Sequence, residues 1–220
     1  MRRVLVLRPE PGASATVERA RAMGLESVTL PLFEVEPVEW RAPDPAGFDG
    51  LLLTSANALR HGGAQLDALR ELPVYAVGER TADAARDAGF DIVAVGDSDV
   101  ERLLSSIPAK LRLLHLAGED RREPAASQAV AGLAVYRSKP IQNPNVDGIA
   151  GSVALVHSPR AGRRFAELAE DRASIAIVAI SPAAAEAVGA GWETVEAAGR
   201  PTDEAVLALA ASLCNKPAPQ

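Results

Sequence analysis

Short apolar runs alternate along the chain with alanine-rich stretches that have the spacing of helices. The runs consist mainly of leucine and β-branched residues, as in "RVLVL" (3–7), "GLLLT" (50–54), "DIVAVG" (91–96) and "IAIVAIS" (175–181). Strands buried on both faces of a parallel sheet are apolar throughout, and each parallel connection needs a crossover, usually a helix. The alternation therefore predicts an α/β fold built on parallel sheets.

The sequence also repeats itself after 103 residues. The shift takes "LLLTSANALR" (51–60) onto "ALVHSPRAGR" (154–163), and "VYAVGERTADAA" (74–85) onto "IVAISPAAAEAV" (177–188). Self-similarity over so long a period indicates duplicated domains, because the repeats of solenoids are shorter.

The strands that the second copy lacks are found near the start of the chain. "LRLLHLAGE" (111–119) resembles "RRVLVLRPE" (2–10), and "LAVYRSKP" (133–140) resembles "LPLFEVEP" (30–37). The repeat therefore predicts two similar, flavodoxin-like α/β domains with parallel sheets, of which one is discontinuous.

The domain boundaries follow from this arrangement. We expect a discontinuous domain of residues 1–33 plus 143–213 and a continuous domain of residues 40–135. Two segments must cross between them, and the proline-flanked, extended stretches 34–39 and 136–142 are the candidates. Side by side they would form a two-stranded linker hinge. Residues 214–220 are expected to form a flexible tail.

Small polar residues follow several predicted strands at their carboxyl ends. In open parallel sheets, ligands bind at these ends, where helix N-termini present free amides. The segments are "LRPE" (7–10), "TSAN" (54–57), "VGERT" (77–81), "AGED" (117–120), "HSPR" (157–160) and "ISPA" (180–183). Each one also reads as an ordinary helix N-cap, and capping does not exclude anion binding. The functional interpretation depends on the set, because a hinge would let "TSAN" and "HSPR" face each other.

Composition limits the compartment and the partners. The net charge of the 220 residues is −6 and aromatic residues are few, which argues against a nucleic-acid-binding surface. Cys214 is the only cysteine, so no internal disulfide is possible and a reducing cytoplasm is the expected compartment. The apolar run before Arg8 is too short for a signal peptide or a membrane span. We expect a soluble, cytoplasmic protein.

Other chemistries lack the motifs they need. No G-x-G-x-x-G follows a strand and no G-x-x-x-x-G-K-[ST] is present, which argues against dinucleotide and triphosphate sites. Of the three histidines, we expect His115 to pack inside a strand and His61 to be exposed, whereas His157, at a strand end, keeps a functional interpretation. With one cysteine and no paired-histidine spacing, no metal site is expected.

Nine motifs, taken together, resemble the uroporphyrinogen-III synthase family and appear in the family's order. They are "LVLRP", "PLFEVEP", "LLLTSANAL", "YAVGERTA", "LHLAGEDRRE", "VYRS", "VHSPRAGRRF", "VAIS" and "GRPTDEAVLAL". Each is weak alone, but in register they cover nearly the whole chain. The resemblance implies two α/β domains joined by a two-stranded linker, as the repeat requires. It also implies a monomeric enzyme of tetrapyrrole, porphyrin and heme biosynthesis that uses no cofactor.

The resemblance further implies a cyclisation. The linear tetrapyrrole hydroxymethylbilane closes into uroporphyrinogen III with loss of water and inversion of ring D. Because the substrate supplies both its electrophile, an azafulvene, and its nucleophile, the enzyme mainly has to position it in the interdomain cleft. Small hydroxyls and free amides suit the substrate's many carboxylates. The alternative is a non-catalytic tetrapyrrole- or anion-binding sensor of the same fold.

Tyr136 is the one residue to which the resemblance gives a chemical role, in hydrogen bonding to the departing hydroxyl of ring A or protonating it. Its counterpart in the repeat is Phe33, so a packing role is the alternative. The residues expected to bind substrate are Arg8, Thr54, Ser55, Asn57, Gly78, Thr81, Arg137, Ser158, Arg160 and Ser181.

The chain departs from the family at two places. In "ISPAAAEA", Ala183 and Ala184 stand where the family often has threonines, so this side has to depend on Ser181 and backbone amides. The segment "EDRREPAASQAVAG" (119–132) is also short, which weakens the contacts expected from its helix.

Overall fold

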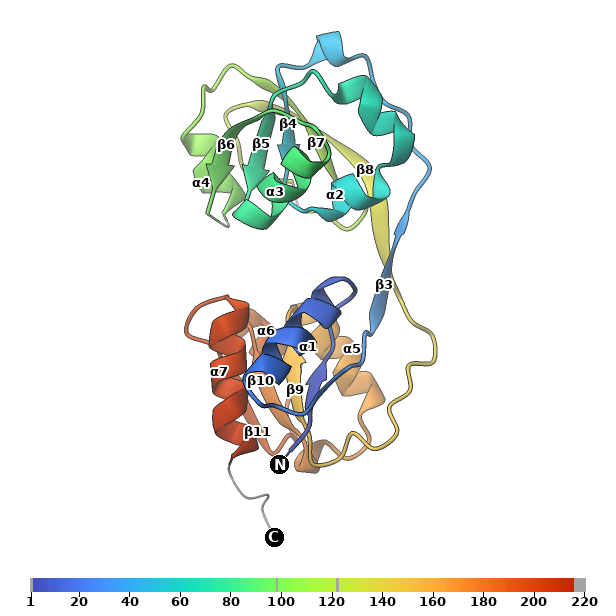
Figure 1. Ribbon diagram of the computed structural model, residues 1–220, viewed down its shortest axis with the longest axis vertical. Coiled ribbons are helices and arrows are strands. Elements are labelled where there is room, and N and C mark those ends of the chain that lie inside the picture. The colour runs from blue at the N-terminus through green and yellow to red at the C-terminus, as the bar shows by residue number, and fades with distance from the viewer. Residues whose placement is uncertain (1, 98, 122, 216–220) are drawn as a thin grey trace. The chain divides into compact units, whose positions relative to one another are not determined.

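The computed structural model describes residues 2–97, 99–121 and 123–215. Contacts divide the chain into two compact units (Figure 1). Unit 1 comprises Met1–Glu34 and Pro140–Gln220, and unit 2 comprises Val35–Lys139. The fold class predicted from the repeat is confirmed: both units are α/β units on parallel sheets, and one of them is discontinuous.

Unit 1 is built on a five-stranded parallel sheet with the order β11-β10-β9-β1-β2. The strands are β1 (Val4–Val6), β2 (Ser27–Thr29), β9 (Val153–Val156), β10 (Ala176–Ala179) and β11 (Thr194–Ala197). Every residue of β1, β9 and β10 is buried. Such strands present apolar side chains on both faces, so both faces of the sheet must be covered by helices.

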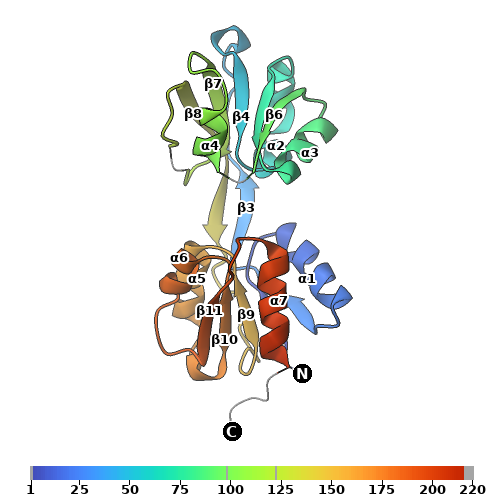
Figure 2. The same cartoon turned by 90° about the vertical axis from the view of Figure 1, so that its left-hand side faces the viewer.

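Helices cover each face of this sheet (Figure 2). One face carries Val4 and Val6 and packs against α1 (Gly12–Ala22) and α7 (Asp203–Cys214). The other face carries Leu5 and packs against α5 (Pro159–Leu168) and α6 (Pro182–Ala187). A short 3-10 helix, η3 (Arg172–Ser174), precedes β10.

Unit 2 contains a six-stranded sheet with the order β3-β8-β7-β4-β5-β6. The strands are β3 (Phe33–Pro37), β4 (Gly50–Leu53), β5 (Val74–Val77), β6 (Ile92–Gly96), β7 (Arg112–Gly118) and β8 (Ala129–Pro140). If β7 and β8 are counted as the first and second strands, β4 to β8 have the order 2-1-3-4-5, as in unit 1 and in flavodoxin-like folds. The duplication is therefore circularly permuted.

The chain passes from one unit to the other within β3 and β8, which are neighbours in the sheet. The divisions fall after Glu34 and after Lys139. The stretches expected as linkers, 34–39 and 136–142, thus lie largely within regular strands.

The helices of unit 2 are shorter and cover its two faces unequally. The face with Leu51 and Leu53 packs against α2 (Asn57–His61), the 3-10 helix η2 (Gly63–Leu69) and α3 (Glu79–Asp87). The face with Leu52 and Leu113 packs against α4 (Val100–Ser105), which supplies the other two buried members of that cluster among the described residues, Leu103 and Leu104. The short η1 (Pro45–Gly47) precedes β4.

The connection between β7 and β8 differs from the one expected. The family resemblance implied a helix in this segment, but none of the described residues in 119–128 is helical. Ten residues, 119–128, join the two strands, which is close to the least that a crossover with a helix requires. Pro124 in the middle of the segment further disfavours a helix there.

The end of α7 also corrects an expectation. Cys214, which we assigned to a tail, is the last residue of α7 and lies buried in the core of unit 1. The part of the expected tail from residue 216 onward lies outside the described residues. Across the ranges that the structure describes, no helix combines the length and the apolar character needed to cross a membrane.

Candidate functional site

The polar segments singled out in the sequence lie at the carboxyl ends of strands in each unit. In a parallel sheet all carboxyl ends meet at one edge, so each unit has one such rim. The unit 1 rim follows β1, β9 and β10 and contains Arg8, His157, Ser158, Arg160 and Ser181. The unit 2 rim follows β4 and β5 and contains Thr54, Ser55, Asn57, Gly78 and Thr81.

Two serines of the unit 1 rim are helix N-caps. The Ser158 Oγ accepts a hydrogen bond of 3.1 Å from the Ala161 amide, and the Ser181 Oγ accepts one of 3.3 Å from the Ala184 amide. Both serines have extended backbones and are followed by a proline at the first helical position, a residue suited to that place. Each oxygen accepts from the helix, which leaves the hydroxyl proton available to an acceptor such as a carboxylate.

The equivalent positions of unit 2 use backbone groups more than hydroxyls. The Ser55 Oγ accepts a hydrogen bond of 3.2 Å from the Asn57 amide. Gly78, the counterpart of Ser181, has a φ of +84°, and its carbonyl accepts from the amides of Thr81 and Ala82. A side chain at position 78 would be strained in this conformation. The Gly78 amide donates to the Gly96 carbonyl, so this glycine shapes the start of α3 rather than offering a free amide.

Thr81 and Asn57 are partly engaged within unit 2. Thr81 is 5% exposed in the first turn of α3, so its side chain is buried within unit 2. The Asn57 Oδ1 accepts a hydrogen bond of 3.2 Å from Arg60.

Thr54 has a buried partner that the sequence did not reveal. Its Oγ1 lies 2.9 Å from the Nε2 of His115 on β7. His115 is 3% exposed, as expected for a packed strand residue, and burial, helped by the Arg121 charge, lowers its pKa to about 4. The imidazole is therefore neutral at neutral pH, and it fixes the Thr54 hydroxyl at the rim.

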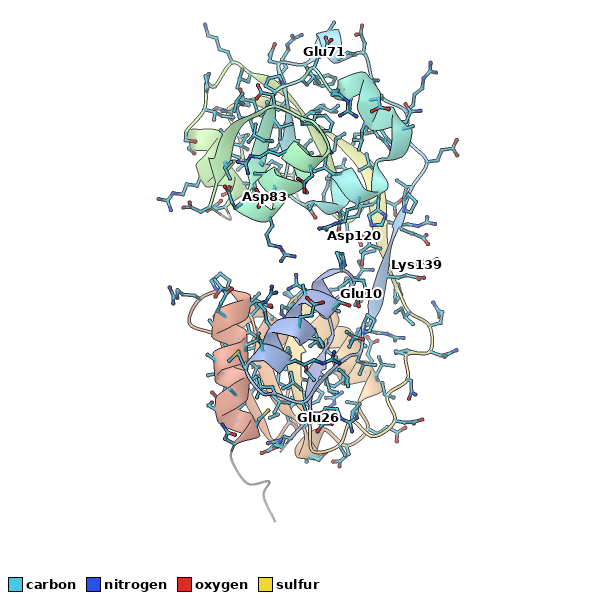
Figure 3. The ribbon with its side chains drawn as sticks, viewed as in Figure 1. Glu10, Glu26, Glu71, Asp83, Asp120 and Lys139 are labelled. Carbon is cyan, nitrogen blue, oxygen red and sulfur yellow. The ribbon has the colours of Figure 1, made fainter. Side chains whose placement is uncertain are left out.

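The three arginines expected to bind substrate all have contacts within their own unit. The Arg8 Nη1 lies 3.4 Å from the Asp203 Oδ1, and the Arg160 guanidinium stacks on the Phe33 ring, 4.5 Å from its centroid. Arg137 lies on β8, where its Nε donates to the Glu36 Oε1 over 2.7 Å. Lys139, labelled in Figure 3, also binds Glu36. Arg137 is thus part of the strand pair β3–β8 rather than of a rim.

Sequence reasoning missed a polar cluster centred on Asp203 at the start of α7. The carboxylate accepts from His157 Nε2 at 3.0 Å, from Thr16 Oγ1 at 2.9 Å and from Arg19 Nε at 2.8 Å. Burial alone would raise the pKa of Asp203, but the hydrogen bonds from His157, Arg19 and Thr16 outweigh it and hold the pKa well below its usual range. His157, for which we kept a functional interpretation, therefore joins β9 to α7.

Tyr136 lies half-buried on β8 beside the carboxyl end of β7, where its backbone carbonyl accepts from the Glu119 amide at 3.0 Å. Its ring is near that of His61, with centroids 6.2 Å apart. His61 was expected to be exposed, but it is half-buried at the end of α2.

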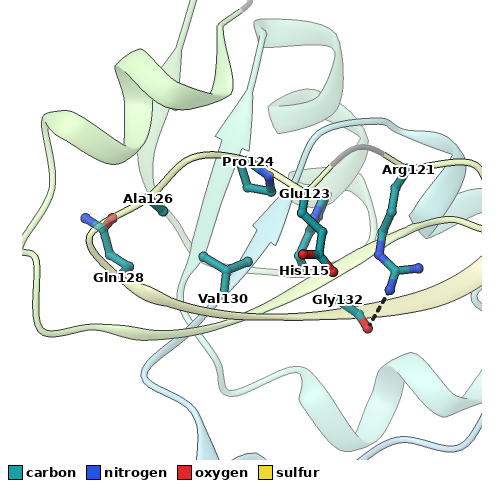
Figure 4. Close-up of a pocket in the computed structure, with 8 residues that line it drawn as sticks. All are labelled: His115, Arg121, Glu123, Pro124, Ala126, Gln128, Val130 and Gly132. Atoms are coloured by element: carbon teal, nitrogen blue, oxygen red, sulfur yellow. Dashed lines mark hydrogen bonds between the residues drawn. The ribbon is translucent and has the colours of Figure 1, made fainter.

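A hollow of about 120 Å³ opens in unit 2 where the expected helix between β7 and β8 is missing. It is lined by His115, Arg121, Glu123, Pro124, Ala126, Gln128, Val130 and Gly132 (Figure 4). The Arg121 Nη2 donates to the Gly132 carbonyl over 3.1 Å, and the Gln128 side-chain Nε2 donates to the Leu104 carbonyl over 2.7 Å. His115 therefore lines this hollow while it binds Thr54.

The fold and the rims define a class of protein: a duplicated, circularly permuted α/β protein with polar helix N-termini at the carboxyl ends of its strands. In the described ranges no three His, Cys, Asp or Glu side chains are grouped so that they could hold a metal ion. The family model of uroporphyrinogen-III synthase HemD matches residues 14–208. The chain belongs to the uroporphyrinogen-III synthase family, which confirms the resemblance seen in its motifs.

Individual relatives agree with the family. The uroporphyrinogen-III synthase of Chlorobaculum parvum (strain DSM 263 / NCIMB 8327) is 32% identical over 123 residues, a match that covers 51% of this chain. The chain spans about half the length of that curated relative, at 50%.

Two solved structures share the fold. The uroporphyrinogen-III synthetase of Helicobacter pylori 26695 gives a TM-score of 0.66 at 20% identity, covering 97% of this chain and all of that one. A mutant uroporphyrinogen III synthase of the extremely thermophilic bacterium Thermus thermophilus gives 0.53 at 19% identity, covering 98% of this chain and all of that one. At such identities the likeness shows the fold alone.

Proposed function

We propose that this chain is a uroporphyrinogen-III synthase, a cyclising hydro-lyase that converts hydroxymethylbilane into uroporphyrinogen III with loss of water and inversion of ring D. The observation that carries the proposal is the match to the family model over residues 14–208. A cytoplasmic, monomeric enzyme without a cofactor, as expected from the single cysteine and the family resemblance, is part of the same proposal.

We assign the binding of the substrate's carboxylates to the rims of both units. The hydroxyls of Ser158 and Ser181 retain a proton for donation while they cap α5 and α6. Thr54 is fixed by His115, and Ser55 stands at the start of α2. Helix N-termini favour anions because their amides point outwards and the helix dipole is positive there. Ala184, one of the two alanines that stand where the family often has threonines, is buried in the core of unit 1.

The chemistry then depends on positioning. The substrate brings its own leaving group and nucleophile, so holding the reacting carbon atoms close together in the required order accounts for most of the acceleration. Tyr136 is the residue to which we assign assistance of the departing hydroxyl. A phenol is a weak acid in this role, so we expect Tyr136→Phe to slow the formation of the type III isomer ~10- to 100-fold while folding and binding are retained.

The test is the identity of the product. Freshly generated hydroxymethylbilane closes spontaneously to the type I isomer, so the III-to-I ratio in the presence of the protein separates catalysis from background. We expect the type III isomer to dominate. Type I product alone, together with tight binding of the tetrapyrrole, would indicate a sensor module instead.

A further inference from the structure

The register of the sheet changes at Tyr136. Ala117 of β7 pairs with Ala134 of β8, but the next residue, Gly118, pairs with Tyr136. Val135 is therefore an extra residue in β8, and the pairing is bulged at this point. Bulges change the direction of the side chains that follow them and are frequent next to active sites. Here the bulge places Tyr136, instead of Val135, opposite Gly118.

Gly118 makes room for the Tyr136 ring. A Cβ atom at position 118 would lie 2.9 Å from the Tyr136 Cε2, 3.1 Å from its Cζ and 3.4 Å from its hydroxyl oxygen. The first of these distances is shorter than real Cβ contacts allow. Gly118 is not among the glycines with positive φ, so its backbone conformation does not require glycine. The close approach of the Tyr136 ring is the reason that the structure gives for a glycine at this place.

His61 bounds the same ring from α2. The two rings are tilted by 38° with centroids 6.2 Å apart. The neighbouring Gly62 carbonyl accepts a hydrogen bond of 2.9 Å from the Trp40 indole, which holds the end of α2 in place. Burial, together with the Arg60 charge, lowers the pKa of His61, which favours the uncharged form of this ring.

The corresponding aromatic residue of unit 1 has different surroundings. Phe33 lies under the guanidinium of Arg160, 4.5 Å from its ring centroid. Both copies thus place an aromatic ring beside the helix that follows the central strand, α5 in unit 1 and α2 in unit 2. Tyr136, which carries a hydroxyl, also packs against a glycine at the end of a strand, Gly118.

We propose that the bulge at Val135, Gly118 and His61 form a seat that fixes the position of the Tyr136 phenol, with Gly118 and His61 acting as positioning residues for the cyclisation. The inference rests on the proposed function, in which the phenol assists the departing hydroxyl. Packing alone would also explain the close contacts, so the test must separate the position of the phenol from the stability of unit 2.

A double-mutant cycle makes this separation. Gly118→Ala is introduced into the wild-type chain and into Tyr136→Phe, and kcat, KM and the midpoint of urea unfolding are measured. The new Cβ strains both backgrounds similarly, because its two shortest contacts are with the ring atoms Cε2 and Cζ, which phenylalanine shares. We expect Gly118→Ala to lower kcat on the order of tenfold in the wild type with little change in KM, and less than about twofold in Tyr136→Phe. An equal factor in both backgrounds would assign Gly118 to packing and overturn the proposal.

A second pair of variants and a spectroscopic readout protect the test against misfolding. His61→Phe keeps a ring against Tyr136 and should keep kcat. His61→Ala removes the ring that packs against Tyr136 and should lower kcat several-fold. Gly47→Ala is the matched control, because a Cβ there meets nothing within 4 Å and the φ is not positive.

The position of the phenol can also be measured by NMR. The chain has only two tyrosines, Tyr75 and Tyr136, so ¹³C labelling at tyrosine Cζ gives two assignable signals. Gly118→Ala should shift the Tyr136 signal and leave that of Tyr75 in place.

The outcomes distinguish the inference from the function on which it rests. A wild-type chain that yields only the type I isomer would overturn both. If the wild type yields type III and Tyr136→Phe is slow, but Gly118→Ala and His61→Ala retain the wild-type kcat, the seat is overturned and the proposed function stands. The seat is supported by a kcat loss in both variants, with the Tyr136 signal shifted by Gly118→Ala and the kcat loss of Gly118→Ala absent in the Tyr136→Phe background.

Discussion

His115 ties the stability of unit 2 to pH. Its pKa is lowered from 6.5 to about 4 because the ring is buried, so the unfolded chain takes up a proton between these values and the folded chain does not. The unfolding free energy of unit 2 therefore keeps its full value above pH 6.5 and decreases as the pH falls from 6.5 towards 4. A difference of this size corresponds to about 3 kcal/mol of unfolding free energy. Urea unfolding at a series of pH values from 7.5 to 4 measures it.

His115→Gln is the variant for this measurement. Without the imidazole, the unfolding free energy of unit 2 should change less between pH 6.5 and 4 than in the wild type. Acid unfolding below pH 4 should remain, because the lowered pKa values of Asp49 and Asp203 act in that lower window. Parallel pH profiles for the wild type and His115→Gln would contradict the assignment.

At the scale of single residues, the sequence indicated where polar residues lie in the fold better than which residues they bind. Ser181 follows an apolar run directly and Ser158 follows one after a single residue, His157, so both helix N-caps can be read from the chain. The pair of Thr54 with His115 and that of His157 with Asp203 join residues 61 and 46 positions apart. No local pattern signals such a pair, because it depends on which strands and helices become neighbours.

Among the elements, α5 allows capping and substrate binding to be separated. Ser158→Ala removes the hydrogen bond to the Ala161 amide, and we expect it to lower the unfolding free energy of unit 1 by about 1 kcal/mol. Ser158→Asp keeps a good cap but places a negative charge where we propose that a substrate carboxylate binds. It should leave stability nearly unchanged and raise KM about tenfold.

Unfolding in urea and steady-state kinetics of the two Ser158 variants check this prediction. Ser181→Asp is the parallel change on α6. Ser158→Asp with the wild-type KM would show that this helix N-terminus does not meet the substrate and that its serine is only a cap.

The elements themselves were predictable to the extent that local patterns define them. Strands such as β4, β9 and β10 are buried on both faces and appear as continuous apolar runs, so their positions could be read directly. The helix that the family resemblance implied between β7 and β8 is absent from the described residues, because the segment 119–128 is short and contains Pro124. The hollow beside His115 follows from that missing helix and could not be predicted before it was known.

For the whole molecule, the repeat predicted the fold, because the strands found in one copy showed which strands the other copy must contain. Each buried core cluster lies within one unit: Val4, Leu5 and Val153 belong to clusters of unit 1, and Leu51 and Leu52 to clusters of unit 2. We therefore expect residues 35–139 to fold alone. Residues 140–220 should not, because β9 would lose its neighbour β1 and the face that α1 covers would be exposed.

Circular dichroism and urea unfolding of the two fragments test this expectation. The 35–139 fragment should unfold cooperatively. The 140–220 fragment should do so only when residues 1–34 are supplied, for example by joining them through a short glycine-serine linker in place of unit 2. A cooperative transition of 140–220 alone would contradict the expectation that β9, β10 and β11 need β1 and β2 to complete their sheet.

The discontinuity of unit 1 has a consequence for the order of events on the ribosome. Residues 2–34 leave the exit tunnel before unit 2 but cannot complete their sheet until β9 has been made, more than a hundred residues later. During that time unit 2 has all of its strands and can fold, while β1 and β2 remain without their neighbour β9 and expose apolar side chains. A segment that is translated before unit 2 thus becomes native after it, and a chaperone that binds nascent chains would meet this protein at β1 and β2.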